Sequence, residues 1–228
     1  MSTIADNIQL VSSRIQAATA AAGRSENSVQ LLAVSKTKPA QDLREAYAAG
    51  LRDFGENYLQ EALGKQLELA DLPLIWHFIG PIQSNKTRAI AEHFDWVHSV
   101  DRLKIAQRLS EQRPAELPPL NICIQVNVSG EASKSGCAPA ELPTLAEAIS
   151  ALPRLKLRGL MAIPEPTEDR AEQDAAFAAV QRLQASLNLP LDTLSMGMSH
   201  DLESAIAQGA TWVRIGTALF GARDYGQP

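Results

Sequence analysis

The stretch Leu31-Leu32-Ala33-Val34-Ser35-Lys36-Thr37-Lys38-Pro39 sets the pattern from which the fold is predicted. Its first five residues form a short, mainly apolar run that is typical of a buried strand. Lys36 follows the run directly. Pro39 near the start of a helix and Gly50 just past its end match the usual positions of these residues at helix ends. One strand, one loop and one helix therefore make a unit.

The same unit recurs along the rest of the chain. The expected strands are 31–35, 53–54, 75–79, 96–99, 120–128, 155–163, 193–196 and 212–215. Eight strands that alternate with helices predict an α/β protein with a single parallel (β/α)8 barrel of the TIM type. An open doubly wound sheet is the alternative, but such a sheet usually has fewer strands at this length.

Helix-start and helix-end signals separate these strands. The expected helices end near Leu69, start at Ser84, run from a cap at Asp101 to Arg113, and cover 139–152, the segment from 170 through Leu187, and roughly 201–208. An extra helix precedes the first strand, with Ser2 as its cap and Gly23 as its stop. Its apolar residues Ile4, Ile8, Val11 and Ile15 share one face.

Composition limits the class of protein. The 228 residues are 45% hydrophobic and 21% charged, as in an ordinary globular protein, and we expect one domain over 1–228. A net charge of -5 gives no general attraction to nucleic acid or anionic membranes. The sequence shows neither a basic leader before an apolar core nor a run long enough for a membrane span. A cytoplasmic protein is expected.

The cysteine and histidine residues do not predict a metal site. Cys123 and Cys137 are the only cysteines and form no Cys-x-x-Cys motif, so neither a disulfide framework nor a zinc site is supported. Cys123 lies in an expected strand and is interpreted as a buried thiol. The four histidines lack the i, i+4 spacing of a helical metal pair.

Lys36 is the first candidate for chemistry, because its amine lies where a buried strand meets a loop. Burial disfavours the ammonium form, and a lysine with a lowered pKa is a nucleophile that forms Schiff bases with carbonyl compounds. The alternative is a lysine whose stem packs on the strand end and whose head reaches water.

Two turns near the end of the chain are candidates for phosphate binding. In a barrel of this kind the active site lies at the carboxyl ends of the strands, and phosphate is often held after strands seven and eight. Gly197-Met198-Ser199 follows the seventh strand, and Gly216-Thr217 follows the eighth. Backbone amides at such turns suit an anion. Two ordinary strand-to-helix caps are the alternative interpretation.

Arg214 is out of phase with its apolar neighbours in the last strand, so it requires a partner or a ligand inside the protein. A salt bridge to a buried carboxylate is one possibility. Together with Lys36 and a phosphate site, an aromatic aldehyde phosphate is the simplest ligand, and Arg214 would face its ring nitrogen. Arginine can only donate hydrogen bonds, so it would keep that nitrogen unprotonated and weaken the ring as an electron sink.

Motifs from the first strand to the last resemble the pyridoxal phosphate homeostasis protein family. They are Leu31-Leu32-Ala33-Val34-Ser35-Lys36-Thr37-Lys38, Phe54-Gly55-Glu56-Asn57-Tyr58, His77-Phe78-Ile79-Gly80, Gln83-Ser84-Asn85-Lys86, Gly159-Leu160-Met161, Met196-Gly197-Met198-Ser199 and Val213-Arg214-Ile215-Gly216-Thr217. The resemblance implies a barrel like the amino-terminal domain of alanine racemase, a fold type III protein. It also implies covalent binding of pyridoxal 5'-phosphate (PLP).

The resemblance assigns cofactor-binding roles to six residues. Lys36 would be the Schiff-base lysine, Ser199, Gly216 and Thr217 would hold the phosphate, Arg214 would address the pyridine nitrogen, and Asn57 would lie beside the cofactor. His200 stands where the family motif often continues with a small or polar residue. The assignment does not depend on that difference.

The resemblance implies a carrier rather than an enzyme. Alanine racemase adds a carboxyl-terminal β domain and a tyrosine base from across a dimer, whereas only residues 218–228 follow the last strand here. We therefore expect a monomer that holds PLP and passes it to apoenzymes or to salvage, with no catalytic residue. A low-activity amino-acid racemase and, less favoured, a Schiff-base aldolase acting on a sugar phosphate are the alternatives.

Overall fold

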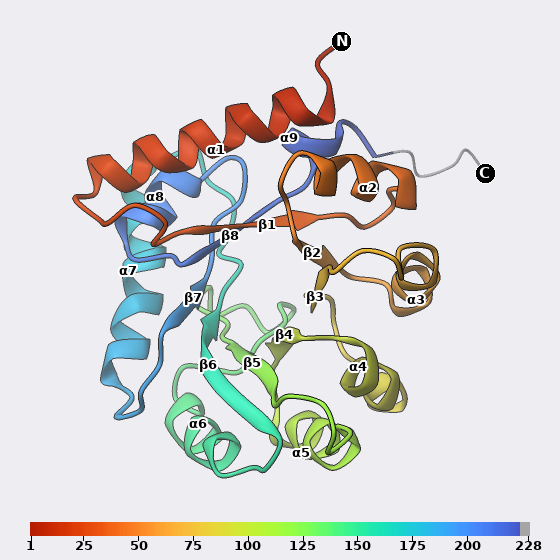
Figure 1. The fold of residues 1–228 in the computed structure, drawn as a ribbon. Helices are drawn as coiled ribbons and strands as arrows, with labels where there is room; N and C mark the ends of the chain where they lie inside the picture. Colours follow the sequence, from red (N-terminus) through yellow and green to blue (C-terminus); the bar gives the residue numbers. More distant parts are fainter. Residues whose placement is uncertain (224–228) are drawn as a thin grey trace.

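Eight parallel strands close into a barrel in chain order in the computed structural model, which describes residues 1–223 (Figure 1). The strands are β1 (Gln30–Val34), β2 (Asp53–Glu56), β3 (Ile75–Phe78), β4 (Trp96–Val100), β5 (Leu120–Gln125), β6 (Leu155–Met161), β7 (Thr193–Ser195) and β8 (Trp212–Ile215). Pairing of β1 with β8, in which Ala33 lies opposite Ile215, completes the ring. The predicted (β/α)8 class is confirmed, and the open sheet is wrong.

Helices surround the barrel. They are α1 (Ile4–Ala21), α2 (Ala40–Ala48), α3 (Leu59–Glu68), the 3-10 helix η1 (Ser84–Lys86), α4 (Thr87–His93), α5 (Leu103–Gln112), α6 (Leu142–Ser150), α7 (Arg170–Ser186), α8 (Leu202–Ala207) and α9 (Thr217–Phe220). The helix α1 lies across the outside of β1 and β8 and contacts α8, α9 and α2 (Figure 1). The predicted extra helix is therefore part of the outer layer.

The hydrophobic core has two compartments. The larger compartment lies between the strands and the helices and includes the fully buried Phe54, Phe94 and Phe177. The smaller compartment is the barrel interior, where residues of opposite phase on the strands point inward. Its apolar clusters are Leu32 with Val34 and Ile79, and Trp96 with Cys123 and Met161, with Trp212 packed against both. Burial raises the pKa of the Cys123 thiol to about 12, which fits a buried, unreactive thiol.

The structure corrects two predicted helix caps. Thr3, not Ser2, caps α1, because Thr3 Oγ1 accepts from the Asp6 amide while the Asp6 carboxylate accepts from the Thr3 amide. Asp101 does not cap α5, which starts after Arg102; its carboxylate accepts from the Arg102 guanidinium instead. The helix start predicted at Ser84 is confirmed, because η1 begins at this residue and leads directly into α4.

Several predicted boundaries are also wrong. The strand expected over 120–128 ends at 125 in β5, and the strand expected over 155–163 ends at 161 in β6. β2 runs to Glu56, beyond the predicted 53–54, since Gly55 and Glu56 pair with β3 although neither has high strand propensity. The helix expected over 139–152 is α6, which is shorter at both ends.

Among the helices of residues 1–223, none combines the length and the apolar character needed to cross a bilayer. The same residues contain no cluster of three or more histidine, cysteine or acidic side chains that could hold a metal ion.

Candidate functional site

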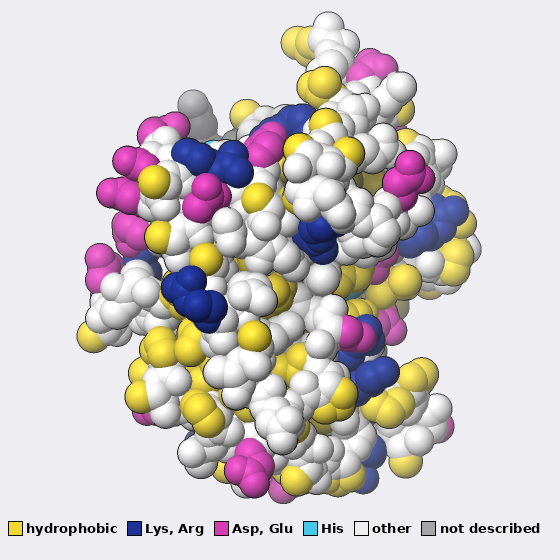
Figure 2. All heavy atoms as spheres, turned by 90° about the vertical axis from the view of Figure 1, so that its left-hand side faces the viewer, with side chains coloured by type: hydrophobic (Ala, Val, Ile, Leu, Met, Phe, Trp, Pro, Cys, Tyr) yellow, Lys and Arg dark blue, Asp and Glu magenta, His cyan; other side chains and the backbone are white. Residues whose placement is uncertain are grey.

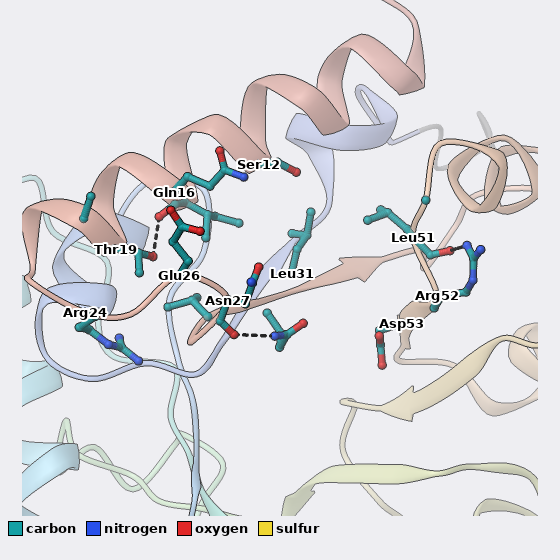
Figure 3. Close-up of a pocket in the computed structure, with 15 residues that line it drawn as sticks. Ser12, Gln16, Thr19, Arg24, Glu26, Asn27, Leu31, Leu51, Arg52 and Asp53 are labelled. Atoms are coloured by element: carbon teal, nitrogen blue, oxygen red, sulfur yellow. Dashed lines mark hydrogen bonds between the residues drawn. The ribbon is translucent and has the colours of Figure 1, made fainter.

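A cavity of about 240 Å³ lies at the carboxyl ends of the strands. The six predicted binding residues all line it: Lys36, Asn57, Ser199, Arg214, Gly216 and Thr217. The fold thus brings together side chains that are up to 181 positions apart in the sequence (217 minus 36). A larger cleft of about 780 Å³ lies under α1 near the opposite mouth of the barrel, and none of the six lines it (Figure 3). The smaller cavity, with its amine and its arginine, is the candidate site; the larger one lacks this combination of groups.

Lys36 is partly buried and lies between two tightly held neighbours. The Ser35 hydroxyl donates to Glu56 Oε1 at 2.9 Å, and the Thr37 amide donates to Glu61 Oε1 at 2.6 Å. Thr37 has a φ of 64°, which is unusual for a β-branched residue and costs about 1–3 kcal/mol. The Glu61 contact stabilises this conformation, which carries the chain sharply away from β1 just after Lys36.

An ion cluster, formed by Glu56, Glu61 and Lys65, hydrogen-bonds to the backbone of this turn. Lys65 Nζ lies 2.7 Å from Glu56 Oε1, 2.6 Å from Glu61 Oε1 and 2.7 Å from the Ser35 carbonyl oxygen, to which it donates. Burial raises the pKa of Glu56, and the contacts with Lys65 and Ser35 oppose that rise. The cluster therefore joins β2 and α3 to the backbone on both sides of Lys36.

The turn after β7 is held by polar contacts from two helices. Gly197 has a φ of 100°, and a Cβ atom there would lie 2.6 Å from Ala205 Cβ, so only glycine fits without movement. The Met198 amide donates to Asp201 Oδ1 at 2.7 Å. From α1, Arg14 Nη2 donates to the Ser199 carbonyl at 2.9 Å. This turn is thus fixed with the Ser199 side chain at the cavity.

The turn after β8 presents backbone donors to the same cavity. Gly216 precedes α9, which starts at Thr217, so the first amides of α9 have no partner within the helix. A Cβ atom on Gly216 would lie 3.2 Å from the Val34 carbonyl oxygen, which shows how closely β8 and β1 approach here. The hydroxyls of Ser199 and Thr217 and these amides form a set of donors suited to an anion.

Arg214 is buried and points inside the barrel. Its Nη1 donates to Ser195 Oγ at 2.8 Å and its Nη2 to the Ala162 carbonyl at 3.1 Å. Among residues 1–223 it forms no ion pair, so the predicted alternative of a salt bridge to a buried carboxylate is wrong; two neutral oxygens take that place. Burial lowers its pKa to about 10, which still leaves it protonated at neutral pH.

Asn57 offers a buried oxygen to the cavity. Within the described residues its Oδ1 has no hydrogen-bond partner, and a buried polar atom of this kind is suited to a ligand. Gly80 makes this position possible, because a Cβ atom there would lie 2.4 Å from the Asn57 carbonyl oxygen. The His77-Phe78-Ile79-Gly80 motif thus contacts the site through its last residue.

Sequence reasoning missed the ion cluster and the residues behind Arg214. Glu56 was visible as a charged residue directly after an expected strand, yet nothing in the sequence indicated that Lys65 would be its partner. His77, His98 and Ser195 are polar residues within apolar strands. The phase argument that identified Arg214 applies to them equally.

Known proteins are similar to this chain over nearly its whole length. Residues 3–224 match the family described as alanine racemase, N-terminal domain. A pyridoxal phosphate homeostasis protein of Pseudomonas aeruginosa is 78% identical over 228 residues, covering 100% of this chain and 99% of that protein.

Solved structures share the fold of this chain. PipY of Synechococcus elongatus without PLP has a TM-score of 0.86 at 44% identity, covering 96% of this chain and 100% of that one. PipY with PLP bound has a TM-score of 0.80 at 46% identity, covering 91% and 100%. Alanine racemase of Corynebacterium glutamicum, at 18% identity and a TM-score of 0.68, covers 99% of this chain and 62% of that one and shares the fold.

Proposed function

The chain belongs to the pyridoxal phosphate homeostasis protein family, and from this premise we propose that it binds PLP reversibly at the Lys36 cavity and takes part in the intracellular homeostasis of this cofactor. The observation that carries the proposal is that one cavity combines an amine, a buried arginine and two donor-rich turns. PipY, a relative at 46% identity, has been solved with PLP bound.

The residues present fit the chemical groups of PLP. The cavity offers one type of group for each reactive part of PLP. An amine suits the aldehyde, an obligate hydrogen-bond donor suits the pyridine nitrogen, and a set of anion-binding donors suits the phosphate. Lys36 would attach the cofactor covalently, Ser199, Gly216 and Thr217 would bind the phosphate, and Arg214 would donate to the ring nitrogen. The orphaned Asn57 oxygen adds a buried acceptor.

When bound, PLP supplies a reactive aldehyde and a ring that withdraws electrons from attached groups. Arg214 keeps its protons at neutral pH and can only donate, so it would hold the ring nitrogen unprotonated and would weaken that withdrawal. The residues of this chain therefore favour storage of the cofactor over reactions that need a stabilised carbanion.

We propose that the protein is a carrier without efficient catalysis. Within residues 1–223, no tyrosine lines the cavity, and Lys36 and His200 are the lining side chains of the types that serve as general bases. His200 Nε2 lies 3.3 Å from Asp201 Oδ2, beside the phosphate-binding turn. One amine at the aldehyde end gives no pair of opposed bases for racemisation.

Borohydride reduction tests the attachment site directly. After reduction of the PLP-loaded protein, peptide mass mapping should find the phosphopyridoxyl group on Lys36, and the visible absorbance should be absent from Lys36→Ala. Lys38→Ala is the matched control, because this lysine is two positions away and donates to the Ala222 carbonyl at 2.7 Å. A label found only on other lysines would overturn the assignment.

A second experiment separates the carrier from a racemase. The loaded protein is incubated with single L-amino acids in deuterated water, and α-proton exchange is followed by NMR. A carrier should show no exchange that depends on Lys36. Lys36-dependent exchange with any amino acid would instead support the low-activity racemase.

The physiological setting is also part of the proposal. We propose a cytoplasmic monomer, comprising one PLP-binding domain, that transfers PLP to apoenzymes that require it. Mixing the loaded protein with an apoenzyme across a dialysis membrane, and in direct contact, separates diffusion of free PLP from transfer between proteins. Equal rates of reactivation in the two arrangements would rule out direct transfer.

A further inference from the structure

A continuous chain of hydrogen bonds crosses the barrel interior behind Arg214. Arg214 Nη1 lies 2.8 Å from Ser195 Oγ, which lies 2.7 Å from His98 Nδ1. His98 Nε2 lies 2.9 Å from His77 Nδ1, and His77 Nε2 lies 2.8 Å from Asp53 Oδ1. Five side chains from β8, β7, β4, β3 and β2 are thus linked without a gap.

The carboxylate at one end and the neutral state of both rings together fix the direction of the hydrogen bonds in this chain. A carboxylate only accepts, so His77 donates from Nε2 to Asp53. A neutral His77 then accepts at Nδ1 from His98 Nε2, and a neutral His98 accepts at Nδ1 from the Ser195 hydroxyl, whose oxygen accepts from Arg214. Each ring therefore carries its proton on Nε2.

The surroundings of the two rings favour this neutral state. His77 stacks on Trp96 with ring centroids 5.4 Å apart and an angle of 13°, and its edge meets Trp212 at 4.9 Å. Burial lowers the pKa of His77, against the opposing effects of Asp53 and the more distant Asp95.

The second ring is held neutral more strongly. Burial lowers the pKa of His98 well below its ordinary value, and both His77 and Arg214 act in the same direction. The charged and titratable groups that act on Arg214 itself are Asp201 and Cys123.

The chain joins the two mouths of the barrel. Arg214 lines the Lys36 cavity, whereas Asp53, the first residue of β2, lines the cleft under α1. Figure 3 shows Asp53 on the side of this cleft away from α1. The Asp53 side chain is 22% exposed, so the negative end of the chain reaches solvent while its middle is fully buried.

We propose that Asp53, His77, His98 and Ser195 are positioning residues that hold the Arg214 guanidinium toward the ring nitrogen of the cofactor and balance its charge from the opposite mouth. Within the described residues no carboxylate forms an ion pair with Arg214, and the aligned dipoles of the hydrogen-bond chain help to stabilise its charge. The direction of the hydrogen bonds is a property of the protein without cofactor. The effect of these hydrogen bonds on the cofactor rests on the proposed function.

The first test uses the protein without cofactor. Long-range proton–nitrogen NMR spectra of histidine-labelled protein distinguish the two neutral tautomers and the charged ring. His77 and His98 should both show the Nε2-protonated neutral form at about pH 7. A proton on Nδ1 of either ring, or a doubly protonated ring at that pH, would overturn the inference because the chain would then be broken or reversed.

The second test uses PLP and two variants. Ser195→Ala should weaken PLP binding by roughly tenfold, because it leaves a buried guanidinium donor without an acceptor. Asp53→Asn is isosteric and partly exposed. It should shift the pH midpoint of the bound cofactor's absorbance downward by about half a unit, because loss of a negative charge disfavours protonated forms.

Asp192→Asn is the matched control. Asp192 also lies near the amino-terminal mouth, where Arg158 donates to both of its oxygens at 2.9 Å, but it is outside the chain. It should leave the spectrum unchanged. The inference would be overturned if Ser195→Ala and Asp53→Asn both kept the wild-type affinity and spectrum. If the wild-type protein bound no PLP, the proposed function would be overturned, but the tautomer result would still stand.

Discussion

The buried imidazoles of His77 and His98 should make the stability of the protein depend on pH. Both folded-state pKa values lie below the ordinary 6.5, with burial as the main cause. Below that pH the unfolded chain binds more protons than the folded one. The contribution of the two histidines to the free energy of unfolding is therefore fully present above about pH 7.5. It falls as the pH drops below 6.5, by up to about 1.4 kcal/mol per pH unit for each ring.

Urea unfolding at a series of pH values measures this dependence. His98→Asn should remove a large part of the slope below pH 6.5, the ordinary histidine value. The control is His93→Asn, because the His93 side chain is half exposed at the end of α4. An equal slope in wild type and His98→Asn would contradict the neutral state assigned to this ring.

The structural role of the ion cluster can be tested at Lys65, because Lys65 is the only cation in this cluster with Glu56 and Glu61. Its side chain is 6% exposed and that of Glu56 is fully buried. Lys65→Met leaves a buried carboxylate without its cation and should lower the free energy of unfolding by about 3–5 kcal/mol. Attachment of PLP should also slow, because the turn around Lys36 loses its support.

The exposed Lys104 of α5 supplies the control for this variant. Lys104→Met should change the free energy of unfolding by less than about 0.5 kcal/mol, as is usual for surface positions. If urea unfolding showed equal, small effects of the two substitutions, the ion cluster would have no structural role.

Single residues show what the sequence could and could not predict about the site. Lys36 and Arg214 were identifiable because an amine at a strand end and an arginine inside an apolar strand each require an explanation. Their surroundings were not identifiable, since His98 and Ser195 are 97 positions apart and meet only once the barrel has closed. Residue type indicates that a partner exists, whereas topology decides which one it is.

Among the helices, α1 has a direct link to the candidate site. From α1, Arg14 donates to both carboxylate oxygens of Glu203 in α8 and to the Ser199 carbonyl. Arg14→Gln should weaken PLP binding several-fold, because the turn that contains Ser199 loses the hydrogen bond that Arg14 donates to it. A PLP titration followed by absorbance measures the change.

The control is Arg44→Gln, since Arg44 makes a very similar set of contacts, none of them with a residue that lines the cavity. It donates to both oxygens of Asp71 and to the Glu68 carbonyl. Both substitutions remove an arginine–carboxylate pair at the surface, so each should change stability by about 1 kcal/mol or less. If Arg44→Gln weakened PLP binding as much as Arg14→Gln, α1 would have no specific role at the site.

The order and type of the elements were predictable, but their ends were not. Apolar runs that alternate with capped helical segments gave eight strands, because a strand buried on both faces has few polar residues. The end of β2 was missed because Gly55-Glu56 reads as a turn, although Gly55 leaves room for Leu32 and Ile79 inside the barrel. Caps were missed where a neighbouring residue had better hydrogen-bond geometry, as with Thr3 and Ser2.

The surface of the whole molecule bears on its assembly. Large exposed hydrophobic side chains are few and come from separate elements, among them Leu10 in α1, Leu67 in α3 and Leu117 before β5. On the face shown in Figure 2, acidic and basic side chains are interspersed with hydrophobic ones. A stable dimer usually buries about 800 Å² on each partner with a more apolar centre. The described surface offers little support for such a contact.

We therefore expect light scattering to give the mass of one chain, with and without PLP, across a wide range of protein concentration. The net charge of -5 opposes self-association further at low ionic strength. Ile163, which is 44% exposed, lines the Lys36 cavity, so in a monomer the mouth of the site stays open to solvent and to recipient proteins. A mass of two chains that persists on dilution would contradict the monomer. If, in addition, Ile163→Asp restored the mass of one chain, the cavity mouth would be the dimer interface and direct transfer of PLP would require dissociation first.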